Sequence, residues 1–258
     1  MRGQSTEHTC NLRRVYDQNL ASVYDLIYGT AIAKDYLAEA VELAGLIRLR
    51  KPDASSLLDV ACGTGQHLFH LRGLFDEVEG VEMSPQMRDI AVSRLGAAVK
   101  IHAGDMRTFD LGRRFDAATC LFSSIGYVQS REELHSSLER FAAHVEPGGV
   151  LIVEPWFSPE VWQAGTVHHI SAEEDRRTVI RLSYSDVTAE GKSSTEMHYL
   201  YGEEGVGVRH WRDDHIMSLF TDDEYVDAFA AAGFTGVQRV PGWRAGRDRL
   251  IAVLPLKS

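Results

Sequence analysis

The chain has 258 residues, of which 44% are hydrophobic and 25% are charged, as is ordinary for a globular protein. Its formal net charge of −10 argues against a nucleic-acid-binding surface, and no apolar run approaches the length of a membrane span. The three cysteines are widely spaced and form no metal-ligand pattern, and the N-terminus carries no signal-like apolar stretch. These features predict a cytoplasmic protein that binds neither nucleic acid nor a membrane.

Helix and strand patterns alternate over the first part of the chain. Asp35 is an expected N-cap, and "EPGGV" at 146–150 is a turn signal before the fifth strand. Strands that alternate with helices predict βαβ units and a doubly wound, mostly parallel sheet. The expected helices are 35–49, 66–74, 85–95 and 131–144, and the expected strands are 56–60, 77–82, 98–102, 115–121 and 149–154.

The pattern changes over residues 160–220. Polar residues alternate there with Val, Ile, Tyr and Thr, as in "RTVIRLSYSD" and "STEMHYLYG", which predicts inserted antiparallel strands. A helix is expected at 221–232, with Thr221 and Glu224 as a capping box. Because no repeat or linker interrupts the sequence, we expect residues 1–258 to form a single α/β domain with an antiparallel insertion.

A glycine turn follows the first predicted strand, in "LLDVACGTG" at 57–65. Gly63 and Gly65 indicate a tight turn where the backbone can approach a neighbouring segment or a ligand closely. An ordinary βα turn is one interpretation. A dinucleotide site is a second, but Leu68 stands where that fingerprint requires a third glycine or alanine. The third is a nucleoside cofactor without phosphates, chiefly S-adenosylmethionine (SAM).

The next two strand ends favour SAM. "VEGVEMS" places Glu82 about 20 residues after Gly63, where a carboxylate can accept hydrogen bonds from ribose hydroxyls. "HAGDMRTF" places Asp105 and Met106 just after the third strand, where they can contact the adenine. Three such elements after three successive strands predict SAM as the cofactor.

The motifs "DVACGTG", "GVEMS" and "GDMR" resemble those of class I SAM-dependent methyltransferases, which have a Rossmann-like fold. "FSSIGY", "LERFAAHVEPGGV" and "VEPWF" are more specifically similar to the nucleotide-sugar N-methyltransferases. Those enzymes N,N-dimethylate a dTDP-linked amino-deoxysugar during antibiotic biosynthesis, as in the desosamine and mycaminose pathways. The resemblance runs from about Tyr16 to Leu250, and relatives are commonly homodimers.

The resemblance implies roles for individual residues. Leu121 stands where relatives usually have methionine, and Tyr36 follows Tyr24 at a spacing one residue longer than in relatives. The implied cofactor contacts are Tyr24, Ala61, Gly63, Gly65, Glu82, Asp105, Met106 and Leu121. The implied acceptor contacts are Tyr16, Tyr36, Trp156 and Arg247, the last as an anchor for the diphosphate.

Tyr16 and Tyr127 are the expected catalytic residues. Methyl transfer depends mainly on orientation and approximation, because the methyl group arrives already activated. The amine must be neutral to attack, and a tyrosine hydroxyl can hold its lone pair toward the methyl group. We therefore expect both tyrosines to orient the amine, with general-base catalysis as the second interpretation.

Other functions remain open at this point. A methyltransferase for another small-molecule amine or hydroxyl is one alternative, and a non-catalytic SAM-binding protein is another. A DNA amino-methyltransferase needs Asp/Asn-Pro-Pro-aromatic where this chain reads "EPWF". No metal site is expected: Asp213, Asp214 and His215 are interpreted as a solvated strand end, and His168 and His169 as surface residues.

Overall fold

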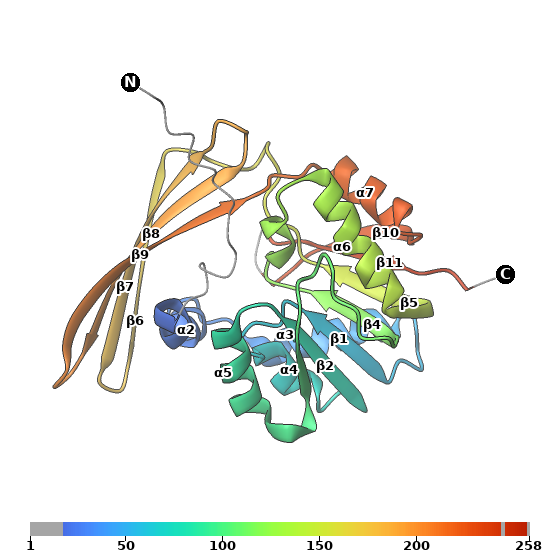
Figure 1. Ribbon diagram of the computed structural model, residues 1–258, viewed down its shortest axis with the longest axis horizontal. Coiled ribbons are helices and arrows are strands. Elements are labelled where there is room, and N and C mark those ends of the chain that lie inside the picture. Colours follow the sequence, from blue (N-terminus) through green and yellow to red (C-terminus); the bar gives the residue numbers. More distant parts are fainter. Residues whose placement is uncertain (1–17, 244–245, 257–258) are drawn as a thin grey trace.

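The computed structural model of the protein describes residues 18–243 and 246–256 (Figure 1). Two β-sheets stand side by side, one of seven strands and one of four. Helix α2 (Gln18–Asp25) and the π-helix η1 (Leu26–Ala31), neither of which was predicted, lie between the sheets. The two sheets therefore bound an interior region from opposite sides, and the cavities described below lie there.

The larger sheet has the strand order β10-β11-β5-β4-β1-β2-β3. Neighbours from β5 to β3 pair in parallel, whereas β11 is antiparallel to both β5 and β10. The doubly wound, mostly parallel sheet that the sequence predicted is confirmed. Its strands are β1 (Ser56–Val60), β2 (Glu77–Glu82), β3 (Lys100–Ala103), β4 (Phe115–Cys120), β5 (Val145–Val153), β10 (Thr235–Val240) and β11 (Arg249–Val253).

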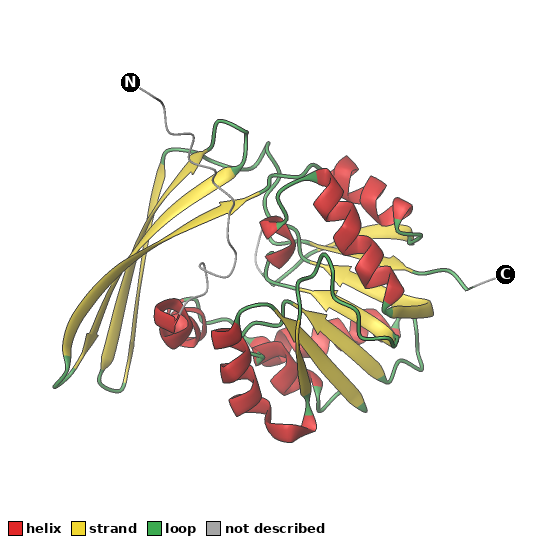
Figure 2. Ribbon diagram, in the orientation of Figure 1, coloured by secondary structure: helices red, strands yellow, loops and turns green. Residues whose placement is uncertain are grey.

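Helices cover both faces of this sheet (Figure 2). On β1, Leu57 packs into the core on one face and Leu58 into the core on the other, which explains why apolar residues occupy consecutive positions of this strand. One face carries α3 (Tyr36–Arg48), α4 (Gln66–Leu71) and α5 (Pro85–Leu95), and the other carries α6 (Arg131–Ala143) and α7 (Asp222–Ala231).

Two helix starts follow the predicted capping. The Asp35 side chain accepts the N–H of Ala38, and Thr221 and Glu224 form the expected capping box at α7. Helix α4 ends earlier than predicted because Gly73 and Leu74 donate to carbonyls three residues back, which tightens the chain into a turn.

Strand β5 starts at Val145, earlier than predicted. Phe115 of β4 pairs with Val145, but Ala117 pairs with Val150, so the register shifts within the first part of β5. Gly148 lies in this irregularity with a φ of 82°. The glycines of "EPGGV" therefore form a bulge inside the strand rather than a turn before it. Strand β3 starts later than predicted, after a 3₁₀ turn η2 (Gly96–Ala98).

The second sheet has four antiparallel strands in sequence order, which confirms the predicted insertion. Odd-numbered residues of β7, such as Val179 and Arg181, face inward, and even-numbered ones, such as Ile180 and Leu182, face outward. Tyr199 and Val179 pack against Val23 of α2. The strands are β6 (Thr166–Glu174), β7 (Arg177–Val187), β8 (Ser193–Glu203) and β9 (Gly207–Met217).

Within the described part of the chain, every helix is too short or too polar to cross a membrane.

Candidate cofactor and acceptor cavities

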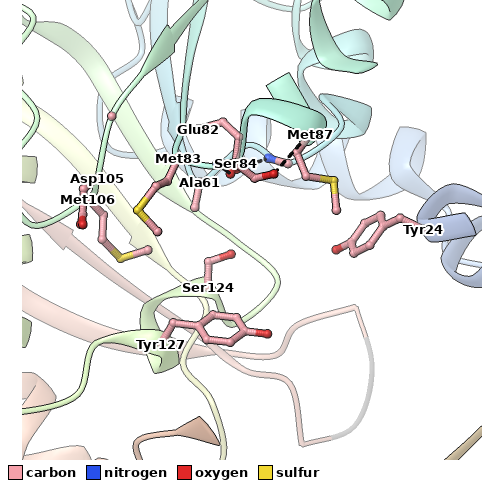
Figure 3. A pocket seen from close by; sticks show the side chains of 12 residues that line it. Tyr24, Ala61, Glu82, Met83, Ser84, Met87, Asp105, Met106, Ser124 and Tyr127 are labelled. Carbon is pink, nitrogen blue, oxygen red and sulfur yellow. Dashed lines mark hydrogen bonds between the residues drawn. The ribbon is translucent and has the colours of Figure 1, made fainter. Parts of the chain in front are cut away.

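A small cavity, called here the cofactor cavity, lies at the carboxyl ends of β1, β2 and β3 (Figure 3). Ligands of parallel α/β sheets bind at this edge. The predicted cofactor residues line it, except for Gly65 and Leu121. The lining residues are Tyr24, Ala61, Gly63, Glu82, Met83, Ser84, Met87, Gly104, Asp105, Met106, Ser124 and Tyr127.

The turn after β1 is built around the carboxylate of Glu82. Ala61 and Gly63 have φ angles of 59° and 57°, so their backbone is left-handed. Oε2 of Glu82 accepts the N–H of Gly63 at 2.9 Å, and Oε1 accepts that of Ser84 at 2.7 Å. Burial raises the pKa of Glu82, although these hydrogen bonds oppose the shift. A carboxylate has more acceptor sites than these hydrogen bonds use, so Glu82 can also accept from a ligand hydroxyl.

Asp105 is held by a neighbouring arginine. Arg107 donates from Nε to Oδ1 at 2.9 Å and from Nη2 to Oδ2 at 2.5 Å. The same guanidinium contacts Glu133 at 2.7 Å, which ties the loop to α6. The Asp105 carboxylate therefore has a fixed orientation at the cavity wall, and its remaining lone pairs can accept from a ligand.

Gly65 and Leu121 pack in the interior and do not line the cofactor cavity as it is described. Gly65 has a φ of 76°, and a Cβ atom there would lie 2.9 Å from Leu95 Cδ1 and 3.2 Å from Ala91 Cβ of α5. Leu121 is buried in the core with Ala117. Neither residue is among the described lining residues, so the structure does not show either one in contact with the cavity.

Asp59, the acidic residue within "LLDVACGTG", is fully internal. It is 1% exposed and accepts the hydroxyl of Thr119 at 2.7 Å, which links β1 to β4. Burial raises the pKa of Asp59 to about 6. Its position below the turn excludes direct contact with the cavity surface.

Tyr127 lines the cofactor cavity on the side that faces a second, larger cavity, which is described after it. Tyr127 is the last residue of the 3₁₀ helix η3 (Ser124–Tyr127), and its side chain packs with Met217 and Trp156. The phenol oxygen lies 2.5 Å from Nδ1 of His215. Burial, together with the charge of Arg181, lowers the pKa of His215 to about 4.

The interpretation of Asp213 and His215 as a solvated strand end was wrong. Asp213 is 9% exposed and His215 is 7% exposed, because odd-numbered residues of β9 face the interior. Asp214 faces outward and pairs with Arg212 at 2.8 Å. The alternation of a strand thus separates residues that are adjacent in the sequence.

The second cavity, called here the large cavity, has a volume of about 1170 Å³. Its wall comes from the start of α3, the inner face of β6, β7 and β8, a loop at 156–163, and the residues Trp243 and Arg247. Trp156 and Arg247 line it, as do His168 and His169, which are exposed as expected. The volume and mixed lining suit a ligand larger than a simple metabolite.

Arg247 is held in place by aromatic rings. Its guanidinium lies 4.6 Å from the ring centroids of both Trp156 and Phe157 and donates to Ser123 Oγ at 2.8 Å. Trp156 is itself fixed by a 2.9 Å hydrogen bond from Nε1 to Ser193 Oγ. A planar cation held in this way is preorganised for phosphate oxygens.

Arg181 adds a second cation to the large cavity. It lies on the inner face of β7, and its Nη1 donates to the Tyr28 hydroxyl at 3.3 Å. Within residues 18–243 and 246–256, no carboxylate pairs with it and its buried Nε has no hydrogen-bond partner. A buried guanidinium in this state favours an anionic ligand.

Tyr36 lies beside the large cavity but is not among its described lining residues. Its ring packs against His67, and the Lys34 ammonium lies 5.2 Å from the ring. Lys34 pairs with Glu39 at 2.5 Å and lies 4.2 Å from the ring of Trp243. Tyr36 therefore packs beside the buried Lys34–Glu39 ion pair and does not line the cavity where the acceptor was expected.

Tyr16 lies outside the described residues. Arg249, a neighbour of Arg247, is 1% exposed and pairs with Glu42 at 2.8 Å, which commits it to the core. In the described ranges, no three His, Cys, Asp or Glu side chains come close enough to hold a metal ion.

Several lining residues were not predicted from the sequence. Met83 and Ser84 follow Glu82 directly, so the "GVEMS" motif carried a signal for them. Arg181 and His215 were missed because strand alternation shows which residues share a face but not which face is internal.

Comparison with known proteins supports the geometry. A protein-family profile described as a methyltransferase domain matches residues 57–149. The structure of SAM-bound CalS10, an amino pentose methyltransferase from Micromonospora echinaspora involved in calicheamicin biosynthesis, is similar with a TM-score of 0.80. It shares 39% identity, covering 93% of this chain and 98% of that chain.

Two curated relatives are more similar still. The dTDP-3-amino-3,6-dideoxy-α-D-glucopyranose N,N-dimethyltransferase of Streptomyces fradiae is 48% identical over 90% of this chain and 89% of its own length. The dTDP-3-amino-3,4,6-trideoxy-α-D-glucopyranose N,N-dimethyltransferase of Streptomyces venezuelae is 45% identical over 93% of this chain and 99% of its own length. The chain belongs to the family of dTDP-amino-deoxysugar N,N-dimethyltransferases.

Proposed function

We propose that this chain transfers two methyl groups in succession from SAM to the amino group of a dTDP-linked amino-deoxysugar in antibiotic biosynthesis. The observation that carries the proposal is the position of Tyr127. Its side chain lines the cofactor cavity and packs against Trp156, which lines the large cavity. Transfer between two bound molecules needs such a junction. The names of the two curated relatives supply the acceptor class.

The residues of the cofactor cavity fit SAM. Glu82 offers two backbone-anchored oxygens for the ribose hydroxyls, and Asp105 offers a fixed carboxylate for the adenine amino group. Met83 and Met106 supply apolar surface beside them. When bound, SAM supplies a methyl group on a sulfonium, whose C–S electron pair leaves with the sulfur.

The large cavity suits a nucleotide sugar. Arg247 and Arg181 are two guanidinium groups on its wall, in a protein whose net charge is −10. A diphosphate needs local positive charge, and arginine can pair with its oxygens bidentately. Trp156 supplies a flat apolar surface for the sugar.

Tyr127 orients the acceptor amine in this proposal. Its hydroxyl projects from the cavity floor toward the side on which Tyr24 lies (Figure 3). The amine loses its proton to water before it attacks, so no strong base is required at this position. Tyr16 has the same proposed role and lies outside the described residues.

The test is to incubate the protein with SAM and a panel of dTDP-amino sugars and to read product masses. The panel contains sugars with the amine at C3 or at C4, and matched sugars with a hydroxyl instead. We expect a gain of two methyl groups on at least one amino sugar and none on the hydroxyl analogues. Methyl gain on the hydroxyl analogues alone would favour the wider class of small-molecule methyltransferases, and SAM binding without any transfer would favour a non-catalytic protein.

We also propose that two copies form a homodimer through the outer face of the four-stranded sheet. Exposed apolar side chains gather there: Val167, Ile180, Leu182, Tyr184 and Leu200 are between 44% and 61% exposed. Apolar patches of this kind mark interaction surfaces. Sedimentation should give a dimer for the wild type and a monomer for Leu182→Glu. A wild-type monomer would exclude this assembly.

We propose that residues 1–258 act as one domain in the cytoplasm. Cys62 and Cys120 are buried free thiols, as a reducing compartment favours. A single cooperative unfolding transition and recovery in the cytosolic fraction of the source cells are the expected results, and two separate transitions would contradict the single domain.

A further inference from the structure

The contact between Tyr127 and His215 joins residues 88 positions apart, one after β4 and one on the inner face of β9. The side chains are both buried, and the phenol oxygen lies 2.5 Å from the imidazole Nδ1. N–H donors usually stay about 2.7–3.2 Å from an oxygen, whereas O–H donors approach more closely. The short contact favours the Tyr127 hydroxyl as the donor and Nδ1 as the acceptor, and the ¹⁵N measurement below tests this direction.

The imidazole of His215 is neutral under working conditions. Burial and the guanidinium of Arg181, which faces it from β7, lower its pKa to about 4. A neutral imidazole has one donor and one acceptor nitrogen, so an accepting Nδ1 places the proton on Nε2. His215 is thus a fixed acceptor for Tyr127 rather than a proton store.

We propose that His215 is a positioning residue that holds the hydroxyl proton of Tyr127, so that Tyr127 meets the acceptor amine only as a hydrogen-bond acceptor. This inference rests on the proposed function. A phenol whose proton were free would donate it to the amine lone pair, which is the electron pair that must form the new N–C bond. With that proton held by His215, an amine N–H donates to the phenol oxygen and the lone pair stays available.

The reaction balances without a change in either residue. The amine lone pair forms the N–C bond, the electron pair of the C–S bond leaves with sulfur, and the methylated ammonium releases one proton to water. Tyr127 and His215 end each transfer as they began it.

The same geometry accounts for two methylations. A neutral primary amine has two N–H groups and a secondary amine has one, so either can donate to Tyr127 while its lone pair faces the methyl group. A tertiary amine has none. The dimethylated product therefore loses this hydrogen bond, and the pair gives the reaction an end point.

The test compares two variants of similar side-chain size. His215→Leu removes the acceptor, whereas His215→Asn can place an amide oxygen near the position of Nδ1. We expect His215→Leu to lower kcat for both methylations about 10-fold, the value of a single hydrogen bond, with acceptor KM and SAM affinity little changed. His215→Asn should recover most of the lost rate. Tyr127→Phe combined with His215→Leu should fall no lower than the slower single variant, because the two act as a unit.

A spectroscopic measurement tests the proton position without turnover. The ¹⁵N spectrum of ligand-free, histidine-labelled protein at pH 7 should show His215 protonated at Nε2, with its Nδ1 resonance displaced in Tyr127→Phe. A proton on Nδ1, or equal rates for the Leu and Asn variants, would overturn the inference. If His215→Leu does not fold, as judged by its melting curve, the Asn variant and the spectrum still decide. Absence of methyl transfer by the wild type would instead remove the proposed function and leave the spectrum interpretable.

Discussion

The two cavities differ in how much of the chain is needed to build them. The cofactor cavity takes its glycine turn and its two carboxylates from the ends of three successive strands, at Gly63, Glu82 and Asp105. The large cavity exists only when Lys34, Arg181 and Arg247 are brought together from distant parts of the chain. The first is a local product of the βα repeat, and the second is a product of tertiary assembly.

The two cavities also differ in charge. Carboxylates of Glu82 and Asp105 stand on the cofactor side, and guanidinium groups of Arg181 and Arg247 stand on the acceptor side. The acceptor side also carries the carboxylates of Asp35, Glu39 and Glu42, of which Glu39 pairs with Lys34 and Glu42 with Arg249. Carboxylates suit the hydroxyls and amino group of a nucleoside, and guanidinium groups suit phosphates. Substitutions on one side should therefore leave binding on the other side intact.

The largest expected effect is that two buried groups, one near each cavity, change the free energy of unfolding with pH in opposite directions. Asp59, beneath the cofactor cavity, has its pKa raised from 3.8 to about 6, so the folded state binds its proton more tightly and stability falls as pH rises through this window. His215, on the acceptor side, has its pKa lowered from 6.5 to about 4, so stability falls as pH falls through the window. Two pKa units correspond to about 3 kcal/mol.

Chemical unfolding between pH 4.5 and 8 checks this prediction. Relative to the wild type, Asp59→Asn should gain stability as pH rises, and His215→Asn should gain stability as pH falls. Stability curves that run parallel to the wild type for both variants would show that neither buried group carries the pH dependence.

The next effect concerns the acceptor side alone. Arg247→Ala should raise KM for the nucleotide sugar by about 10-fold or more, the 1.5–3 kcal/mol of a charge-assisted hydrogen bond, and leave SAM affinity unchanged. Arg176→Ala is the matched control, because that arginine is 68% exposed at a hairpin remote from the cavity wall. Steady-state kinetics with each substrate varied make the measurement. A change within twofold for Arg247→Ala would point to Arg181 as the main cation.

Most of the residues that the sequence suggested for the cofactor line a single cavity, and this has a physical reason. The hydrophobic run of β1, the glycines after it and the acidic residue after β2 follow one another within short segments, and the carboxyl ends of parallel strands meet at one edge. The βα repeat therefore converts order in the sequence directly into proximity in space.

The acceptor side could be predicted only in part. The alternation in "RTVIRLSYSD" indicated a strand, but whether Arg181 or Leu182 faces inward depends on how the four-stranded sheet packs over α2. For the same reason His215 was interpreted as solvated. Strands β10 and β11 were missed, since β11 pairs with β5, which is distant in the sequence, and β10 joins the sheet through β11.

On the cofactor side, Glu82→Ala should weaken SAM binding by about 1–3 kcal/mol, because the ribose hydroxyls lose their carboxylate acceptor and the N–H groups of Gly63 and Ser84 lose the group that fixes the turn. Acceptor KM should stay unchanged. Glu77→Ala, at the exposed start of the same strand, is the control. Calorimetry that finds wild-type affinity in Glu82→Ala would remove Glu82 from the cofactor site.

The smallest effect tests whether Gly65 is needed for its left-handed backbone or for contact with the cofactor. Gly65 has a φ of 76° and does not line the cofactor cavity as described, so its proposed role is to let the chain enter α4. Gly65→Ala should lose about 1 kcal/mol of unfolding free energy, since alanine is strained in the left-handed region. Of the two crowded neighbours, Leu95 Cδ1 is the end of a flexible side chain and can shift, whereas Ala91 Cβ at 3.2 Å must move by a few tenths of an ångström with its helix.

Gly45→Ala provides the opposite control. Gly45 lies inside α3 with nothing within 4 Å of an added Cβ, so alanine there should gain about 0.5–1 kcal/mol. Denaturant unfolding should therefore shift in opposite directions for the two variants, with SAM affinity close to wild type in both. A large loss of SAM affinity in Gly65→Ala without a loss of stability would mean that this glycine acts by letting the cofactor approach the backbone, and the resemblance-based role of Gly65 as a direct contact would replace the conformational one.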